Sequence, residues 1–524
     1  MKKLVYWGIG KIGKDCLKYY PEKVPELIID SNCSDSEWDG IPICKPEMVT
    51  DWKSLLVVIT VVKSTPIKEY LKKKGLTENI DFQDYKDFLN VHSENVEENI
   101  LRLSNAVSKS SDLTNRTLIF APAFSARQSD VLINFLNQYA KQKKCVLITY
   151  WGIIPEKLVY EKLAFPVFHY ATIPYPGGEN EGTGLVDKTE KIALPAEDLI
   201  WIKELENRKQ GTKNEQFWKY LLQSYWYQEK IIHIFNPREV VIWGGWGYGS
   251  SIYGYLCEKY HIPYGYMEYG WLPGTYQVEP KGFAGLGESV GLPNPETDVD
   301  FEKINEIKQY ITSRKLDTNT FFVNLEDEEK FRSIDGRKKT VFLIGMDDYG
   351  MAINPDSAYW KEYISSAVSS TKEAYEICKE ICKKYHWNFI FKPHPNSERK
   401  NKIADEDGES IMFQDMQIDE LIEKADVAVS IASAVNYKVL LYGTPLVQIG
   451  FTTLTGKGCC YEARIKEQIE DNLKRAMEQG MMRRQRENFD KHLSMLLDYY
   501  LWDDLSEREL RYGQTFDRDF PLKY

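Results

Sequence analysis

Two apolar runs in the last third of the chain each end in polar residues, and this pattern constrains the fold most. The first run ends in Lys392-Pro393-His394-Pro395, and the second ends in Ser430-Ile431-Ala432-Ser433, just before a helical pattern. In an open α/β sheet, ligands bind outside the carboxyl ends of the strands, and helix N-termini at that edge hold phosphate through free N–H groups. The sequence therefore predicts that a cation, an imidazole and hydroxyl groups converge on one pocket.

The residue types in this predicted pocket suit a phosphate group. Lys392 and His394 offer positive charge and hydrogen-bond donors, and the prolines on both sides of His394 keep it out of a helix. We expect the phosphate of a nucleotide donor to be held by Lys392, His394, Ser430, Ser433 and Asn436. The other histidines are expected to be structural; they are His92, His169, His233, His261, His386 and His492.

Composition and charge set the broad class of protein. The chain has 524 residues, a formal net charge of -11 and 43% hydrophobic residues, which predicts about three soluble globular domains. An acidic chain of this kind is not expected to bind nucleic acid, and no apolar run is long enough to predict a transmembrane helix. The nine cysteines and seven histidines are scattered without a recurring CxxC pair, which favours a reduced, cytoplasmic compartment and does not support a metal site.

The first residues carry a dinucleotide-binding fingerprint in its usual context. A predicted strand is followed by Gly8, Gly10 and Gly13 and by a helix, and Asp30 ends the next strand. Such glycines let the backbone approach a pyrophosphate, and the aspartate can bind ribose hydroxyls. We predict a Rossmann-like unit over residues 1–90, with these four residues as its nucleotide site. Because fold does not fix function, it stays open whether this unit holds a nucleotide sugar, NAD or no ligand.

Alternating strand and helix patterns continue after the first unit. A polar, serine-rich stretch at 91–115 predicts a linker helix. Two further doubly wound domains are predicted over 116–330 and 338–480, followed by a helical segment at 481–524. One long helix is expected over 465–500. The predicted fold class is therefore α/β with three Rossmann-like units.

Glycine-rich, aromatic segments follow two predicted strands of the second domain. Trp246 and Trp271 each lie beside glycine at a predicted strand end, and sugars stack on such flat apolar faces. We therefore expect Trp246, Gly270 and Trp271 on the acceptor side; the alternative is that the aromatics belong to the core and the glycines only form turns. Glu268 lies among these aromatics, a setting that removes water and raises the pKa of a carboxyl group, as a general acid or base requires. A structural salt bridge is the alternative role for Glu268.

Two adjacent acids, Asp347 and Asp348, follow the predicted strand over 340–344. They are candidate catalytic residues together with Glu268 and His394, since paired acids at a strand end could order an acceptor or bind a divalent ion. A cap of the following turn or helix is the expected role of one of them. No metal is required, because the groups that hold the phosphate already offset its charge.

These segments, taken in order, resemble four blocks of bacterial capsular polysaccharide biosynthesis proteins, which include the transferases that add Kdo from CMP-Kdo. The blocks are Met267–Thr275, Gly345–Asp348, Lys392–Pro395 and Ser430–Pro445. The resemblance implies that the last two Rossmann-like domains form a GT-B type pair across a cleft. It also implies a glycosyltransferase that moves a sugar from a nucleotide-activated donor, favoured as CMP-linked, to a glycan or lipid-linked acceptor.

The resemblance extends to cofactors and location. The first domain is similar to the N-terminal domain of sugar acetyltransferases and polysaccharide-assembly enzymes, which implies sugar-nucleotide metabolism. No cofactor beyond the donor is implied, and a nucleotide in the first domain stays open. A cytoplasmic protein is expected, with room for peripheral contact with polysaccharide-assembly machinery at the inner face of the membrane. The chain departs from the family at Met346, where glutamine is usual, and at Lys438, where glutamate is usual.

Three alternatives remain open. The Lys-Pro-His-Pro segment and the later Ala-Asp-x-x-x-Ser strand end also resemble polyol-phosphate transferases of the teichoic-acid kind, which would use CDP-glycerol. Met346 and Lys438 favour a non-catalytic sugar-nucleotide-binding scaffold of capsule assembly. An NAD-dependent oxidoreductase rests on the glycine fingerprint of the first domain alone. The stereochemical course of transfer, retaining or inverting, also stays open.

Overall fold

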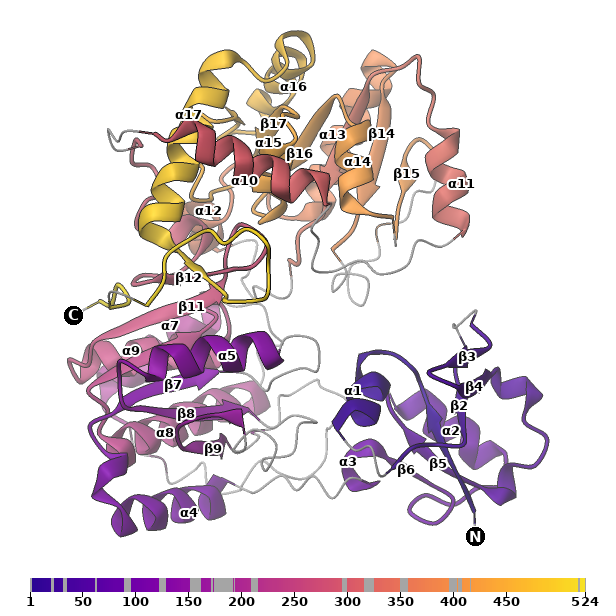
Figure 1. Ribbon diagram of the computed structural model, residues 1–524, viewed down its shortest axis with the longest axis vertical. Coiled ribbons are helices and arrows are strands. Elements are labelled where there is room, and N and C mark those ends of the chain that lie inside the picture. The colour runs from indigo at the N-terminus through magenta and orange to yellow at the C-terminus, as the bar shows by residue number, and fades with distance from the viewer. Residues whose placement is uncertain are drawn as a thin grey trace. The chain divides into compact units, whose positions relative to one another are not determined.

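The computed structural model describes most of the chain as two compact units. The described residues are 2–19, 23–31, 35–61, 64–88, 96–121, 129–150, 162–170, 173, 192, 194–208, 215–294, 299–314, 325–348, 357–394, 403, 408–414, 416–516 and 519–523. One unit comprises Met1–Ile192 with Leu222–Glu239, and the other comprises Ala193–Leu221 with Val240–Tyr524. The strands form three sheets (Figure 1), which confirms the predicted α/β fold class with Rossmann-like units.

The first sheet has the strand order β3-β4-β2-β1-β5-β6. Its strands are β1 (Lys3–Trp7), β2 (Leu27–Ile29), β3 (Glu37–Trp38), β4 (Ile41–Cys44), β5 (Leu55–Ile59) and β6 (Phe82–Asp84), and its helices are α1 (Lys11–Tyr19), α2 (Thr65–Lys73) and α3 (Tyr85–Phe88). All neighbours pair in parallel except β3 and β4, which form a hairpin. The chain runs from β1 to β2 on one side and reaches β5 on the other. This is the strand order of a Rossmann half.

Three further strands of the first unit are parallel. They are β7 (Thr117–Ala121), β8 (Cys145–Tyr150) and β9 (Val167–Tyr170), accompanied by α4 (Val96–Lys109) and α5 (Ser129–Ala140). Strand β8 pairs with both β7 and β9. Helix α8 (Glu215–Phe235) then leads to the next strand.

The second unit begins with a mixed group of strands. They are β10 (Glu239–Trp243), β11 (Tyr264–Tyr269), β12 (Thr275–Glu279) and β19 (Leu501–Asp503), with helices α7 (Ala196–Arg208) and α9 (Tyr248–Lys259). Strands β10 and β11 are parallel, whereas β12 pairs antiparallel with both β11 and β19. The hairpin β11–β12 therefore carries Glu268 close to its turn.

The third sheet is fully parallel, with the order β15-β14-β13-β16-β17-β18. Its strands are β13 (Thr340–Ile344), β14 (Asn388–Lys392), β15 (Ile411–Met412), β16 (Val427–Ser430), β17 (Leu446–Gln448) and β18 (Tyr461–Glu462). Its helices are α10 (Phe301–Ser313), α11 (Leu325–Ser333), α12 (Ala358–Tyr363), α13 (Thr371–Tyr385), α14 (Ile418–Lys424), α15 (Val435–Leu441), α16 (Glu467–Gln479) and α17 (Arg483–Met495). Helices cover both faces (Figure 1), which explains why β13 is apolar at every position except its first.

Helix α10 belongs to the packing of the third sheet. Its buried residues Ile304, Ile307 and Ile311 lie in the same core cluster as Phe342 of β13 and Ile390 of β14. The predicted second domain, over 116–330, includes this helix, whose polar composition hides a narrow apolar stripe.

The expected single helix over 465–500 is wrong. Helix α16 ends at Gln479, and Gly480 follows with a φ of +62°, a left-handed conformation that glycine adopts without strain. Helix α17 then starts at Arg483 and ends in a π-helical turn over Leu496–Tyr500. The chain continues as β19, so the segment at 481–524 is not helical throughout.

A glycine at the end of β13 allows two strand ends to approach each other. The Gly345 N–H donates to the Lys392 carbonyl at 2.9 Å. A Cβ at Gly345 would lie 2.8 Å from three backbone atoms of Lys392, Pro393 and His394. The backbone after β14 therefore packs directly on this glycine.

The substitution Gly345→Ala is expected to lower the free energy of unfolding by about 1–3 kcal/mol, because the overlap is with backbone that cannot rotate away. Urea denaturation would measure the loss. Gly336→Ala is the matched control, since its Cβ would meet no atom within 4 Å. Equal stability of the two variants would contradict the close approach.

Candidate functional site

Three neighbouring strands of the third sheet end at the same level. Ile344, at the end of β13, pairs in register with Lys392 of β14 on one side and with Ser430 of β16 on the other. Adjacent strands are about 4.8 Å apart, so Lys392 and Ser430 are separated by roughly 10 Å. The chain leaves β13 for β14 on one side and later returns to β16 on the other. This reversal is the position at which open α/β sheets bind ligands.

His394 and Asp347 face each other across two of these strand ends. The His394 Nδ1 lies 4.0 Å from Asp347 Oδ2, and the imidazole keeps 38% of its side chain exposed. Burial lowers the pKa of His394, and the Asp347 charge opposes this shift. The imidazole is therefore neutral near pH 7 and can donate one hydrogen bond. Residues 395–402, which follow it, lie outside the described part of the chain.

Lys392 is largely buried and has a contact inside the protein. Its Nζ donates to the Gln414 carbonyl at 2.8 Å. The same segment is fixed by Asp327, whose Oδ2 accepts from the Gln414 N–H at 2.8 Å and the Met416 N–H at 3.0 Å. Lys392 thus secures the chain after β15, and its predicted contact with phosphate stays a prediction.

Buried polar atoms at the end of β16 and in the first turn of α15 have no hydrogen-bond partner in the described part of the chain. Ser430 Oγ and both side-chain polar atoms of Asn436 are fully buried and form no hydrogen bond with any described residue. Ser433 Oγ accepts from the Val435 N–H at 3.2 Å. Buried polar groups are nearly always paired, because leaving them unpaired costs about 1–3 kcal/mol each. Ser430 and Asn436 therefore carry polar groups that no described residue uses.

The two adjacent acids have different environments. Asp348 is 3% exposed and accepts from the Thr371 N–H at 2.9 Å and the Thr371 hydroxyl at 2.7 Å. Burial raises the pKa of Asp348, and the two bonds from Thr371 oppose the shift. Asp348 thus holds the first residue of α13, rather than capping the turn or helix that directly follows it in the chain. Asp347 is the acid beside His394.

Glu268 has the perturbed carboxyl group that the sequence predicts. It is half-buried near the end of β11, opposite Gln277 of β12. Burial raises its pKa to about 7, although its Oε1 accepts from the Tyr269 N–H at 3.1 Å. Its Oε2 lies 3.7 Å from where a Cβ would stand at Gly244, so the carboxyl group adjoins the glycine-rich turn after β10. A group with this pKa can exchange a proton near neutral pH.

The three predicted acceptor-side residues have different environments. Trp246 and Trp271 are half-buried and pack against the two core clusters of the third sheet. Trp271 stacks on Tyr437 of α15, with ring centres 5.4 Å apart. A Cβ at Gly270 would lie 2.0 Å from the Thr275 hydroxyl, so this glycine is required by the turn. Contact of these three residues with an acceptor stays a prediction.

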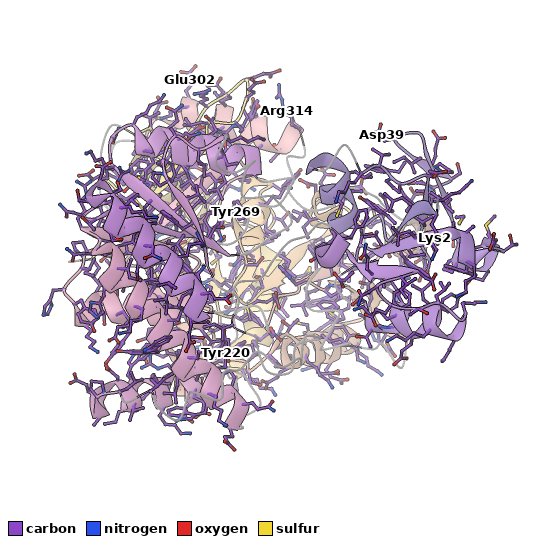
Figure 2. The ribbon with its side chains drawn as sticks, turned by 90° about the horizontal axis from the view of Figure 1, so that it is seen from below. Lys2, Asp39, Tyr220, Tyr269, Glu302 and Arg314 are labelled. Carbon is purple, nitrogen blue, oxygen red and sulfur yellow. The ribbon has the colours of Figure 1, made fainter. Side chains whose placement is uncertain are left out.

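Tyr269, which Figure 2 labels, is an exposed aromatic residue beside Glu268 that was not among the predicted site residues. Its side chain is 38% exposed, the largest exposure among the aromatic residues named around Glu268. It stacks on Tyr276 with ring centres 5.6 Å apart and meets the edge of Trp243 at 5.1 Å. The available signal was its place next to Glu268 at the strand end.

The glycine fingerprint of the first domain adopts the predicted strand–turn–helix form. Gly8 has a φ of +112°, and a Cβ at Gly13 would lie 2.2 Å from the Gly8 carbonyl oxygen. Gly10 has open space where a Cβ would stand. Asp30 Oδ2 accepts from the Ile9 N–H at 3.0 Å, so this acid orders the turn. Nucleotide binding by these residues stays a prediction.

Met346 and Lys438, where the resembled sequences usually have glutamine and glutamate, are both buried. Met346 is 4% exposed and belongs to a core cluster of the third sheet. Lys438 Nζ lies 2.6 Å from Asp419 Oδ2 of α14, and both side chains are almost fully buried. The Tyr442 hydroxyl donates to the other oxygen of Asp419 at 2.6 Å. Lys438 therefore forms a buried ion pair between two helices.

Comparisons with known proteins give structural likenesses alone. No protein-family model and no curated protein matches the chain. Among solved structures, it is similar to two KpsC proteins from Thermosulfurimonas dismutans. The beta Kdo 2,7 transferase is 14% identical over 52% of this chain and 82% of that one, with a TM-score of 0.29. The beta Kdo 2,4 transferase is 14% identical over 50% and 80%, with a TM-score of 0.35.

A third similar structure is UDP-GlcNAc 2-epimerase from Neisseria meningitidis bound to UDP-GlcNAc. It is 10% identical over 72% of this chain and 93% of that one, with a TM-score of 0.32. At such identities and scores these likenesses carry no inference about activity. Within the described residues, the structure contains no helix that is both long and apolar enough to cross a membrane.

Proposed function

We propose that the chain is a glycosyltransferase that takes a sugar from a nucleotide-activated donor and adds it to a glycan or lipid-linked acceptor. The observation that carries the proposal is the register of Lys392, Ile344 and Ser430, which brings His394 and the Ser433 turn to one edge at the strand reversal. A donor phosphate at this edge would accept hydrogen bonds from the neutral imidazole and from the unused polar groups of Ser430 and Asn436.

The proposed reaction breaks the bond between the anomeric carbon and the nucleotide phosphate. A new bond forms between that carbon and an acceptor oxygen, whose proton passes to Glu268, and the nucleotide leaves with the bonding electrons. The raised pKa of Glu268 supports the role of base. A covalent intermediate on Glu268, or a positioning role for it, would require the same carboxyl group at the same place.

The favoured donor is a CMP-linked sugar of the Kdo kind, on the resemblance of the four sequence blocks. A polyol-phosphate transferase using CDP-glycerol is the second candidate, and the His394 and Ser430 strand ends favour it equally. In that reaction Glu268 would matter less. A scaffold that binds a nucleotide sugar without turnover is the third, favoured by the buried Met346 and the paired Lys438.

Nucleotide release from a panel of donors tests these candidates. The purified full chain is incubated with CMP-Kdo, CMP-sialic acid, UDP-GlcNAc and CDP-glycerol, and free nucleotide is quantified by chromatography. We expect release from a CMP-linked sugar. Release from CDP-glycerol alone would select the polyol-phosphate reaction, and binding of nucleotide without release from any donor would select the scaffold.

The substitution His394→Ala is expected to lower the rate of nucleotide release by about 100-fold or more. Removing one preorganised hydrogen-bond donor to the charge that develops in the transition state usually has an effect of this size. Release is measured under saturating donor. His233→Ala, at an exposed position on α8, is the control and should leave release unchanged. Equal rates for the two variants would remove His394 from the site.

A further inference from the structure

We propose that Arg508 is a positioning residue, which fixes the turn between β11 and β12 and through it the place of Glu268. The inference rests on the proposed function, since that function makes Glu268 the reacting carboxylate. Arg508 lies in a segment that we call the C-terminal strap, residues 501–516, which begins with strand β19. The sequence around Glu268 does not predict a contact with this segment, which is far away in the chain.

The strap is joined to β12 by a backbone ladder. Strand β19 pairs antiparallel with β12, with Thr275 opposite Asp503 and Gln277 opposite Leu501. The Asp504 N–H also donates to the Gly274 carbonyl at 3.0 Å. The strap therefore runs along β12, the strand that lies opposite Glu268. It also reaches the turn between β11 and β12.

Arg508 holds the apex of that turn with a planar fork. Its Nη1 donates to the Gly274 carbonyl at 2.8 Å and to the Pro273 carbonyl at 3.2 Å. Its Nη2 donates to Asp503 Oδ2 at 2.7 Å, and the side chain is only 10% exposed. The Tyr512 hydroxyl donates to the same Pro273 carbonyl. One guanidinium thus connects the strap to two consecutive carbonyls, a geometry that lysine cannot reproduce.

The turn is shaped to admit the guanidinium. Gly274 has a φ of +77°, and a Cβ built on it would lie 1.6 Å from Arg508 Nη1. Any other residue at this position would displace the arginine. Gly274 and Arg508 are therefore complementary in space as well as in hydrogen bonding.

Hydrogen bonds within the hairpin connect the apex to Glu268. The Gly270 N–H donates to the Thr275 carbonyl at 2.7 Å, and Gln277 Nε2 donates to the Tyr269 carbonyl at 2.7 Å. The Thr275 hydroxyl donates to the Leu272 carbonyl at 2.7 Å. A shift of the apex is therefore passed to Tyr269 and Gly270, the two residues that follow Glu268.

The test compares Arg508→Lys with Arg511→Lys, an exposed arginine three residues further along the strap. Amide hydrogen exchange, read by mass spectrometry on peptides covering 268–277, needs no substrate. We expect exchange there to be at least about fivefold faster in Arg508→Lys and unchanged in Arg511→Lys, since local opening frees these amides. Unchanged exchange in Arg508→Lys would overturn the proposed clamp.

The second readout separates positioning from mere stability. With the donor that supports nucleotide release, Arg508→Lys is expected to lower kcat about tenfold and to leave KM for the donor within about twofold, because misplacement of a reacting group affects the chemical step. Faster exchange without a fall in kcat would overturn the positioning role. If wild type released nucleotide from no donor, the proposed function would fail, while hydrogen exchange would still decide the clamp.

A milder variant covers the case in which Arg508→Lys does not fold. Tyr512→Phe removes one hydrogen bond to the Pro273 carbonyl and keeps the ring packed. We expect the same two effects at smaller size, about twofold to threefold in kcat, as loss of one neutral hydrogen bond predicts. No change in either exchange or kcat would count against the clamp.

Discussion

Replacing Glu268 by glutamine is expected to lower kcat by about 10²- to 10⁴-fold, the contribution usually made by a positioned acid or base. Glutamine keeps the size of the side chain and can still accept the Tyr269 N–H, so the backbone contact survives. What is lost is the ability to take a proton. The rate of nucleotide release from the active donor measures the effect.

The pH dependence of the same reaction gives a second reading. As a base, Glu268 must be ionised, so kcat/KM for wild type is expected to rise with pH up to about 7 and then level off. The residual rate of Glu268→Gln should not show this rise with pH. Glu302→Gln, at an exposed position on α10 that Figure 2 labels, is the control. If the rise of kcat/KM with pH persisted in Glu268→Gln, the titrating group would be a residue other than Glu268.

The raised pKa of Glu268 also determines how the free energy of unfolding changes with pH. Between about pH 4.5 and pH 7 the folded chain holds a proton on Glu268 that the unfolded chain has lost, so this residue makes the fold less stable as pH rises through that window. Glu268→Gln is therefore expected to be stabilised relative to wild type more at pH 8 than at pH 4. Urea denaturation at the two pH values checks the direction. Burial also raises the pKa of Glu279, to about 8. Its effect on stability is the same in wild type and variant, so it cancels in the difference between them.

Lys438→Met is expected to destabilise the fold by about 3–5 kcal/mol, the cost of leaving one member of a buried ion pair uncompensated. Asp419 would then keep the Tyr442 hydroxyl but lose its cation. Chemical denaturation measures the loss, and Lys372→Met, at an exposed position on α13, is the matched control.

The double variant Lys438→Met with Asp419→Asn sharpens this prediction. Removing both charges should recover most of the lost stability, because no unpaired charge is left in the interior. A loss below about 1 kcal/mol in Lys438→Met alone would show that the pair is hydrated.

The parts of the fold that were predictable are those whose signal is local. Strand β13 was predicted over 340–344, which are its observed bounds, because a strand buried on both faces is a short continuous apolar run. The polar residues after such runs mark the carboxyl edge of a sheet. His394 and Ser430 were therefore expected at one edge of the sheet, and the register places Lys392 and Ser430 on either side of Ile344.

The parts that were not predictable depend on pairings between distant residues. The sequence could not show which member of Asp347-Asp348 would face His394, since that depends on the position of Thr371 at the start of α13. Trp271 was predicted as a ligand-binding aromatic from its local pattern, whereas its stacking partner Tyr437 lies on α15, far along the chain. Local patterns do not encode such contacts.

The C-terminal strap also has a consequence for synthesis of the protein. Arg508 follows Gly274 by 234 residues, and ribosomes add about 5–20 residues per second, so roughly 10 to 50 s pass between the two. During that time the edge of β12 that later receives β19 has no partner, and unpaired edges invite association with other chains. We expect nascent chains of this protein to need shielding until the last segment emerges. Slow translation or low temperature should therefore change the yield of soluble protein more than it changes the stability of the finished fold.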